Sequence, residues 1–336
     1  MPRLRRTSPQ EPGWTRRRSG RGFVYLDADG ERLPAEEVAR IRALAIPPAW
    51  RDVWITPHPN GHLQAVGTDD AGRRQYLYHP QWRARRDAQK FDRVLDFGVA
   101  LGRARPAILG ELGLDGMPLE RACATAVRLL DLGCFRIGDD VYADRHGSFG
   151  LTTLERAHVR RTGDALVFRF MGKSGVAHRI EIADAPVVAA IESMRRRRDG
   201  EPALLAYREA GGWRRLTPAI VNDYVRASTG ADATAKDFRT WHATVLAAAR
   251  LAERGLDLDE GASATKRRRA VTATMRDVAE FLGNTPTMAR TSYVDPRVVS
   301  AFDEGRTIAA AVRRRHADSD ARQVALERAT LRLIRG

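Results

Sequence analysis

The sequence predicts an α+β fold in two parts, a small β-rich N-terminal domain and a larger, mainly α-helical domain that carries a β-hairpin. Three observations support this class. Short alternating or aromatic segments, separated by turn clusters, fill residues 23–79. From Trp82 onward, apolar residues recur at the three- and four-residue spacing of a helix with one buried face. A length of 336 residues with 43% hydrophobic residues is sufficient for two cores.

The first 22 residues carry seven arginines and one acidic residue among Pro, Gly and Ser. This composition is typical of a mobile arm, so we expect a basic, flexible arm over residues 1–22. The arm lacks the apolar stretch of a secretory signal. No apolar run in the chain approaches the roughly 18 residues of a membrane span. The sequence therefore predicts a cytoplasmic protein that has no membrane partner.

Residues 23–86 are expected to form an N-terminal domain with an antiparallel sheet and short helices. Turn residues such as Asp29-Gly30 and Pro59-Asn60-Gly61 separate its apolar segments. The candidate strands lie at 23–26, 53–55, 63–66 and 75–78, and a helix is expected at 35–44. Nine arginines and nine acidic residues lie within residues 23–88, so any anion-binding surface depends on where the side chains are placed.

Residues 87–336 are expected to form the second, larger domain. Buried helix faces are indicated at 119–130, 238–249 and 271–282, and the tail from Val312 predicts another amphipathic helix. Between them, residues 165–170 and 176–182 alternate apolar and polar side chains around the string Gly172-Lys173-Ser174-Gly175. This pattern predicts a β-hairpin with Lys173 at its tip.

The charge balance favours a polyanionic partner. Lys and Arg total 57 against 42 Asp and Glu, which gives a formal charge of +15. Only four of these cations are lysines, namely Lys90, Lys173, Lys236 and Lys266. Because the guanidinium fork matches phosphate oxygens, the arginine excess indicates nucleic acid as the simplest partner. An arginine bias of the protein surface without such a role is the alternative on composition alone.

Five short sequence motifs contain the candidate catalytic residues. They are Phe135-Arg136-Ile137-Gly138, Met171-Gly172-Lys173-Ser174-Gly175, Lys236-Asp237-Phe238-Arg239-Thr240, Leu282-Gly283-Asn284-Thr285-Pro286 and Ser292-Tyr293-Val294-Asp295-Pro296. In their order and context they resemble the active-site elements of type IB DNA topoisomerases, specifically the poxvirus-like and bacterial branch of the eukaryotic-type topoisomerase I superfamily. The resemblance covers nearly the whole chain and includes Gly72-Arg73-Arg74-Gln75-Tyr76 in the first domain. Two of the four lysines fall where the family pattern requires them.

The resemblance implies a transesterification on a DNA phosphodiester. Tyr293 would be the nucleophile that forms a 3'-phosphotyrosyl link and expels a 5'-hydroxyl, so that the bond energy is kept for resealing. Arg136 and Arg239 would donate hydrogen bonds to the non-bridging oxygens of the phosphate. Since these cations supply the charge that a metal supplies elsewhere, we expect no metal site and no cofactor. The two cysteines, Cys123 and Cys134, likewise indicate neither a disulfide scaffold nor a zinc site.

Lys173 is the expected general acid toward the leaving 5' oxygen. Lys236 is given a supporting role in phosphate contact. Asn284 stands where the poxvirus-like enzymes carry histidine, and because an amide does not titrate, its expected role is contact with the oxyanion. Thr285 and Pro286 predict a helix N-cap and first helical residue directly after it.

The resemblance also implies DNA-binding residues outside the catalytic set. Besides Lys236, these are Arg74, Gln75, Tyr76, Tyr78 and Tyr142. A core role for the alternating aromatic residues of this strand is the alternative. His242 follows Trp241 where relatives commonly have a small residue, and we interpret it as a packing residue.

The sequence thus predicts a monomeric type IB topoisomerase, a bilobed clamp on duplex DNA with a tyrosine-recombinase-like catalytic domain. It would relax positive and negative supercoils without ATP or metal and would associate with the nucleoid. Tyrosine recombinases or integrases are the nearest alternative, but they usually carry histidine at the position of Lys236 and have a helical N-terminal domain. A catalytically inert DNA-architectural protein is the second alternative, and the intact set of five residues argues against it.

Overall fold

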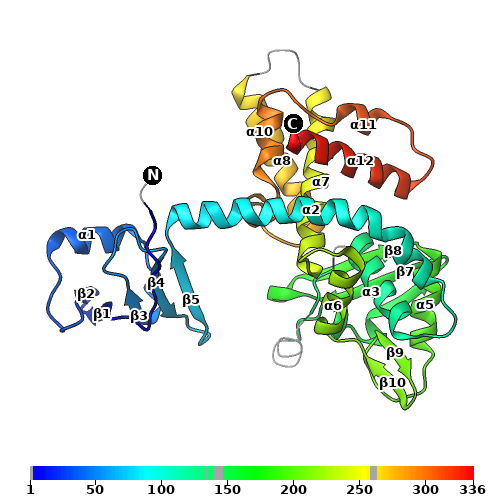
Figure 1. Cartoon of the computed structure of the whole chain (residues 1–336), viewed down its shortest axis with the longest axis horizontal. Helices are drawn as coiled ribbons and strands as arrows, with labels where there is room; N and C mark the ends of the chain where they lie inside the picture. The colour runs from blue at the N-terminus through cyan, green and yellow to red at the C-terminus, as the bar shows by residue number, and fades with distance from the viewer. Residues whose placement is uncertain (1–2, 134, 139–146, 258–262) are drawn as a thin grey trace. The chain divides into compact units, whose positions relative to one another are not determined.

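The structure is a computed structural model, and it describes residues 3–133, 135–138, 147–257 and 263–336. The chain divides into two compact units, residues 1–90 and 91–336. The N-terminal unit is dominated by an antiparallel sheet, and the second unit is mainly helical with small sheets (Figure 1). The predicted α+β class is therefore confirmed. No helix among the described residues has both the length and the apolar character that crossing a membrane requires.

The N-terminal unit is built on a five-stranded antiparallel sheet in the order β2-β1-β3-β4-β5. Its elements are β1 (Trp14–Ser19), β2 (Gly22–Leu26), α1 (Ala35–Ala43), β3 (Arg51–Ile55), β4 (Leu63–Thr68) and β5 (Arg74–Tyr78). Tyr25, Ile41 and Ile55 belong to the small core of this unit. Because β5 pairs only with β4, it is an edge strand of the sheet.

The expectation of a flexible arm over residues 1–22 is wrong for Trp14–Ser19, which forms β1 and pairs with β2 and β3. Arg16 is compatible with a strand because its side chain has partners, and Arg17 and Arg18 are exposed. The Arg16 guanidinium lies 4.2 Å from the centroid of the Phe23 ring. It also donates hydrogen bonds of 2.6 to 3.2 Å to three carbonyl groups within residues 46–50. Stacking and hydrogen bonding thus hold this charge against the sheet.

The second unit is organised around α7, which contacts α3, α6, α8, α10, α11 and α12. The helices are α2 (Pro80–Leu112, which begins in the N-terminal unit), α3 (Leu119–Gly133), α5 (Ala185–Arg195), α6 (Pro218–Thr229), α7 (Ala235–Leu256), α8 (Ala264–Leu282), α9 (Pro286–Met288), α10 (Pro296–Asp303), α11 (Ala309–Arg313) and α12 (Ser319–Arg335). In Figure 1, α8, α10, α11 and α12 lie above the horizontal helix α2, and α3, α5 and α6 lie below it together with β7 to β10.

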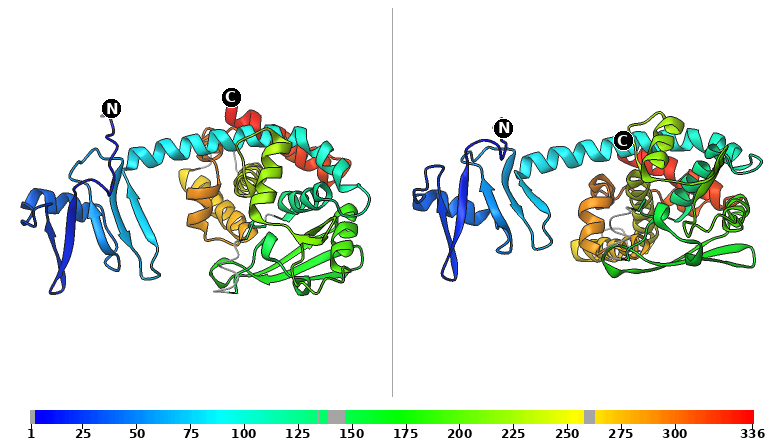
Figure 2. Two further views of the ribbon diagram at one scale, coloured as in Figure 1. Left: turned by 60° about the horizontal axis from the view of Figure 1, so that its bottom comes forward. Right: turned by 90° about the horizontal axis from the view of Figure 1, so that it is seen from below.

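The predicted hairpin is present as β7 (Ala165–Met171) and β8 (Ala177–Ile182), with a short helical turn, η3 (Lys173–Gly175), at its tip. The strand β6 (Val159–Thr162) extends it to a three-stranded antiparallel sheet. A second hairpin pairs β9 (Ala206–Glu209) with β10 (Gly212–Arg215). Both appear in green in Figure 2. The sheet is thus larger than the single hairpin that the alternation indicates.

The N-terminal half of α7 is fixed by aromatic packing. Phe238 and Trp241 are fully buried. The Phe97 ring of α2 meets Phe238 edge to face at a centroid distance of 4.8 Å. Gly98 allows α2 to approach Trp241 closely, because a Cβ at this position would lie 2.7 Å from the indole ring. Burying side chains of this size stabilises a fold by roughly 2 to 3 kcal/mol each, so the first turns of α7 form a rigid platform.

Candidate active site

Tyr293 lies in a buried position at the end of a π-helical turn, η4 (Ala289–Tyr293), and is only 8% exposed. Its backbone is held by Thr244 of α7. The Thr244 hydroxyl donates to the carbonyl of Tyr293 at 3.2 Å and accepts from the amide of Asp295 at 3.1 Å. Asp295 in turn caps the N-terminus of α10 by accepting from the Arg297 amide. The backbone of Tyr293 is therefore held against α7 by Thr244, which lies about one turn after Arg239 in that helix.

Arg239 is placed by the start of α7. Thr234 and Asp237 form a capping box at this end of the helix, and Arg239 is 4% exposed. Its Nη2 donates to the carbonyl of Leu282 at 2.7 Å. Its guanidinium carbon lies 5.5 Å from the centroid of the Tyr293 ring. The second arginine of the sequence pattern and the tyrosine are thus neighbours.

Arg136 and Asn284 meet from two other elements. Arg136 lies in the extended segment after α3, and its Nη2 donates to Oδ1 of Asn284 at 2.6 Å. Asn284 follows the C-terminus of α8 and precedes α9, whose N-cap is Thr285 and whose first residue is Pro286. The predicted cap is therefore confirmed, and it places Asn284 at the beginning of a helical turn.

Two donors of this cluster have no hydrogen-bond acceptor among the described residues. Nε of Arg136 and Nδ2 of Asn284 are buried and lack hydrogen-bond partners within the described ranges. Buried polar atoms are rarely left in this state, because desolvation without a hydrogen bond is costly. Unsatisfied donors beside a tyrosine fit a site that receives an external acceptor such as a phosphate oxygen.

The electrostatic environment favours ionisation of Tyr293. Burial by itself raises the pKa of the phenol, but the charge and hydrogen bonding of Arg239 and Arg136 outweigh burial, and the pKa is lowered from its ordinary value. A lowered pKa means that the developing phenolate is stabilised more than the neutral phenol. The four residues Arg136, Arg239, Asn284 and Tyr293, from segments far apart in the sequence, are thus brought into one cluster.

The two lysines lie apart from these contacts. Lys173 is exposed at the hairpin tip, and Lys236 is exposed on the first turn of α7. Neither makes an ion pair or a side-chain hydrogen bond to any residue that the structure describes. Their charges therefore remain available to a ligand, and the role of each stays a proposal.

The predicted DNA-binding residues of the N-terminal unit separate onto two faces of β5. Arg74, Tyr76 and Tyr78 alternate on the exposed face, where the two tyrosine rings stack at a centroid distance of 6.2 Å. Gln75 lies on the opposite face and donates to Asp69 at 2.9 Å. The exposed tyrosines do not fit the alternative core role. Tyr142, also predicted, lies outside the described residues.

Sequence reasoning gave no role to two residues of this region, Thr244 and His178. Thr244 fixes the backbone of Tyr293, as described above. His178 of β8 lies near both arginines, and burial together with their charges lowers its pKa. The alternation of the hairpin places His178 opposite Phe170. No local pattern indicates that either residue reaches the tyrosine cluster.

His242, interpreted as a packing residue, is buried but also has polar neighbours. Its Nε2 lies 3.1 Å from Oδ1 of Asp131, and its Nδ1 lies 3.3 Å from the amide nitrogen of Gln323. It therefore connects α7 to both α3 and α12. Cys123 is a free, buried cysteine, and Cys134 lies outside the described residues.

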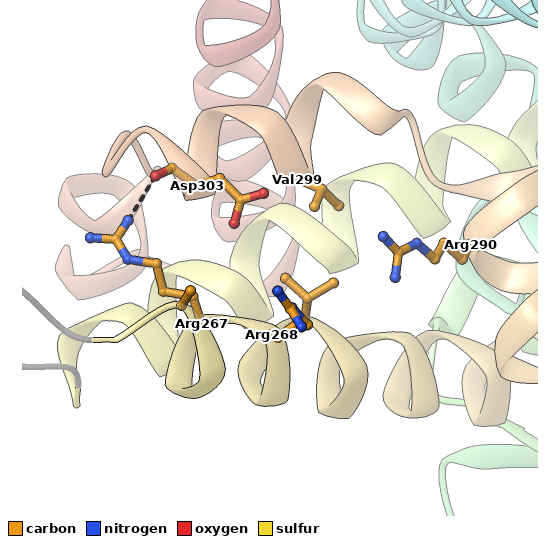
Figure 3. A pocket seen from close by; sticks show the side chains of 7 residues that line it. Arg267, Arg268, Arg290, Val299 and Asp303 are labelled. Atoms are coloured by element: carbon orange, nitrogen blue, oxygen red, sulfur yellow. Dashed lines mark hydrogen bonds between the residues drawn. The ribbon is translucent and has the colours of Figure 1, made fainter.

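A separate cavity of about 440 Å³ lies beside the tyrosine segment (Figure 3). It is lined by Ala264, Arg267, Arg268, Val271, Arg290, Val299 and Asp303. Arg290 belongs to the same π-helical turn as Tyr293, but its side chain lines this cavity and not the tyrosine cluster. Among the described residues, no group of three His, Cys, Asp or Glu side chains is placed to hold a metal ion.

Comparison with known proteins identifies the family. The family "Eukaryotic DNA topoisomerase I, catalytic core" matches residues 79–314, and "Bacterial DNA topoisomerase IB, N-terminal domain" matches residues 22–69. The protein named DNA topoisomerase 1B of Acanthamoeba polyphaga mimivirus is 29% identical over 237 residues, which cover 69% of this chain and 70% of the viral protein. The first match spans well over half of the chain, and it includes all five residues of the predicted catalytic set. The chain therefore belongs to the type IB DNA topoisomerase family of enzymes.

Proposed function

We propose that this protein cuts and reseals one strand of duplex DNA without ATP or a metal ion, and so relaxes supercoils of both signs. The observation that supports the proposal best is the pair of guanidinium groups beside the buried Tyr293. Together they lower the pKa of its phenol in spite of burial. Two fixed cations next to an attacking oxygen also stabilise the negative charge of a pentacoordinate phosphate.

In the proposed cleavage step, the Tyr293 oxygen releases its proton to solvent water and forms a bond to phosphorus, while the bond from phosphorus to the 5' oxygen breaks. Lys173 donates a proton to that 5' oxygen, which leaves as a hydroxyl. The 3'-phosphotyrosyl ester keeps the bond energy, so the reverse attack by the 5'-hydroxyl reseals the strand.

The remaining residues position the phosphate in this proposal. Arg136, Arg239 and the amide of Asn284 donate to the non-bridging oxygens, and the unsatisfied donors described above supply part of these bonds. Lys236 contacts a phosphate near the start of α7. In the N-terminal unit, Arg74, Tyr76 and Tyr78 contact the DNA backbone from the exposed face of β5. The enzyme is proposed to act as a monomer in the cytoplasm, at the nucleoid where its substrate lies.

The test is relaxation of a supercoiled plasmid in excess EDTA without ATP. Complete relaxation of positively and negatively supercoiled DNA is expected, because the cations needed for catalysis belong to the protein. Absence of relaxation under these conditions, restored by Mg²⁺ or ATP, would reject the mechanism.

The nucleophile is tested separately with Tyr293→Phe. This variant is expected to bind duplex DNA with the affinity of the unchanged protein but to form no covalent adduct on a denaturing gel. Arg290→Ala is the matched control, since Arg290 lies on the same turn with its side chain in the separate cavity. An adduct of normal yield with Tyr293→Phe would assign the nucleophile to another residue.

A further inference from the structure

We propose that His178 is a positioning residue, which holds the hairpin that carries Lys173 against the turn that carries Asn284. The inference rests on the proposed transesterification and adds a residue that none of the five motifs assigns a role. The supporting observation is that the imidazole ring of His178 packs closely on two glycines from different parts of the chain, Gly172 and Gly283.

On the hairpin side, the ring covers the backbone directly before Lys173. His178 stands opposite Phe170 in the β7–β8 register, and the two rings stack at a centroid distance of 5.1 Å. Phe170 continues the stack onto Phe135, which immediately precedes Arg136. A Cβ added to Gly172 would lie 2.5 Å from the imidazole. The ring therefore packs directly on the backbone of Gly172, the residue before Lys173.

On the other side, the same ring lies against the end of α8. A Cβ added to Gly283 would lie 2.5 Å from Cε1 of His178. Gly283 has a φ of +60°, the left-handed conformation that ends α8 and that glycine adopts without strain. Asn284 is the next residue, and its Oδ1 accepts from Arg136. The His178 ring thus lies between the hairpin that carries Lys173, the proposed acid, and the turn that carries Asn284, the proposed oxyanion contact.

The charges around the ring favour its neutral form. The charged groups that face it are Arg136, from the segment after α3, and Arg239, from α7. The groups that contact it from β7 and from the end of α8, Phe170, Gly172 and Gly283, carry no charge. Burial and the two guanidinium groups lower the pKa of His178. Protonation as the pH falls would place a third cation in the cluster, which loosens the contact.

The experiment compares His178→Ala, His178→Phe and the control His316→Phe, whose residue lies before α12. Each is assayed for the single-turnover cleavage rate at saturating DNA, for DNA affinity and for the pH profile. His178→Ala is expected to cleave about a hundredfold more slowly with unchanged affinity, because small displacements of catalytic groups cost rates of this order. His178→Phe keeps the stack and is expected to restore most of the rate. Its profile should lack the decline of the unchanged protein at acid pH.

Two results would overturn the proposal. A His178→Ala rate equal to that of the unchanged protein would show that the ring positions nothing. A His178→Phe rate as low as that of His178→Ala would show that the imidazole itself takes part in the chemistry.

A second measurement does not depend on the proposed function. Amide hydrogen exchange of the DNA-free protein should increase at Gly172–Gly175 and at Asn284 in His178→Ala, but not in His178→Phe. Unchanged exchange in His178→Ala would refute the positioning role even if cleavage were slow. If the unchanged protein formed no covalent adduct with DNA, the proposed function would be rejected. The hydrogen-exchange measurement would still decide whether His178 has a positioning role.

Discussion

At the scale of single residues, the chemistry depends on which atoms surround one phenol. Tyr293 is nearly buried, and a buried phenol ordinarily resists ionisation. Arg136 and Arg239 reverse this tendency from two different elements, so the pKa of the phenol is lowered. Their removal should therefore affect both the transition state and the ionisation of Tyr293, the proposed nucleophile.

We predict that Arg136→Ala and Arg239→Ala each reduce the cleavage rate by about a hundredfold or more, the typical effect of losing one donor to an oxyanion. Lysine in place of either arginine should restore little of the cleavage rate, since an ammonium group cannot donate the two parallel hydrogen bonds of a guanidinium group. Single-turnover cleavage of an end-labelled duplex measures this effect. Arg290→Ala, which removes an arginine from the same segment as Tyr293, should cleave at a normal rate.

The pH dependence gives a second prediction. In Arg239→Ala, the pKa of Tyr293 should rise because burial is then less opposed. If the cleavage rate increases as the phenol of Tyr293 loses its proton, Arg239→Ala should reach its maximum rate at a higher pH than the unchanged protein. The measurement is the pH–rate profile on the alkaline side, compared with that of Arg290→Ala. An alkaline limb at the same pH in both variants would contradict the electrostatic role of Arg239.

At the scale of elements, α7 carries Arg239 and Thr244, and α12 packs against α7. The connection is a network of buried charges. Arg105 of α2 forms ion pairs with Asp131 of α3 at 2.8 Å and with Glu327 of α12 at 2.7 Å. His242 of α7 lies between Asp131 and Gln323 of α12. Although burial opposes ionisation of Asp131, its neighbours His242 and Arg105 keep its pKa well below the usual range.

We predict that Arg105→Met lowers the free energy of unfolding by about 3 to 5 kcal/mol at neutral pH, because the buried carboxylates of Asp131 and Glu327 both lose their ion pair with Arg105. Arg306→Met, which breaks an exposed pair with Glu304, should cost less than about 1 kcal/mol. Denaturant unfolding measures both values.

The pH dependence of this loss has a definite sign. A carboxylate with a lowered pKa stabilises the fold above its ordinary pKa, and the contribution is lost as the pH falls through the lowered value. The difference between Arg105→Met and the unchanged protein should therefore shrink in acid. An equal difference at neutral and acid pH would show that the network contributes through packing alone.

Elements whose signals are local could be predicted from the sequence. The β7–β8 hairpin, the faces of α3, α7 and α8, and the cap at Thr285 are all fixed by residues close together in the chain. The strand β1 could not be predicted, because the guanidinium of Arg16 is held by the Phe23 ring and by carbonyl groups some 30 residues later. The contacts of Thr244 and His178 depend on tertiary packing, and no spacing in the sequence indicates them.

At the scale of the whole molecule, the formal charge of +15 governs association with DNA. Arginines dominate this charge, and several of them, including Arg16 and Arg105, are held by internal partners. Only the remainder can neutralise phosphates.

We therefore predict a steep decrease of duplex affinity with salt, linear in a plot of log K against log salt concentration. Each neutralised phosphate contributes a slope of about −0.9. Arg74→Ala, which removes an exposed cation from β5, should reduce the magnitude of the slope by about one such contribution. Fluorescence anisotropy over a series of salt concentrations measures it. An affinity independent of salt would contradict binding that is dominated by phosphate contacts.

The burial of Tyr293 has a consequence for chemical labelling. Tyr76 is 45% exposed and Tyr78 is 39% exposed, whereas Tyr293 is 8% exposed. Reagents that nitrate or iodinate phenols will therefore modify Tyr76 and Tyr78 before they reach Tyr293, the proposed nucleophile. Loss of activity should lag behind incorporation of the label. At one modified tyrosine per molecule, the label should lie on Tyr76 or Tyr78 and not on Tyr293.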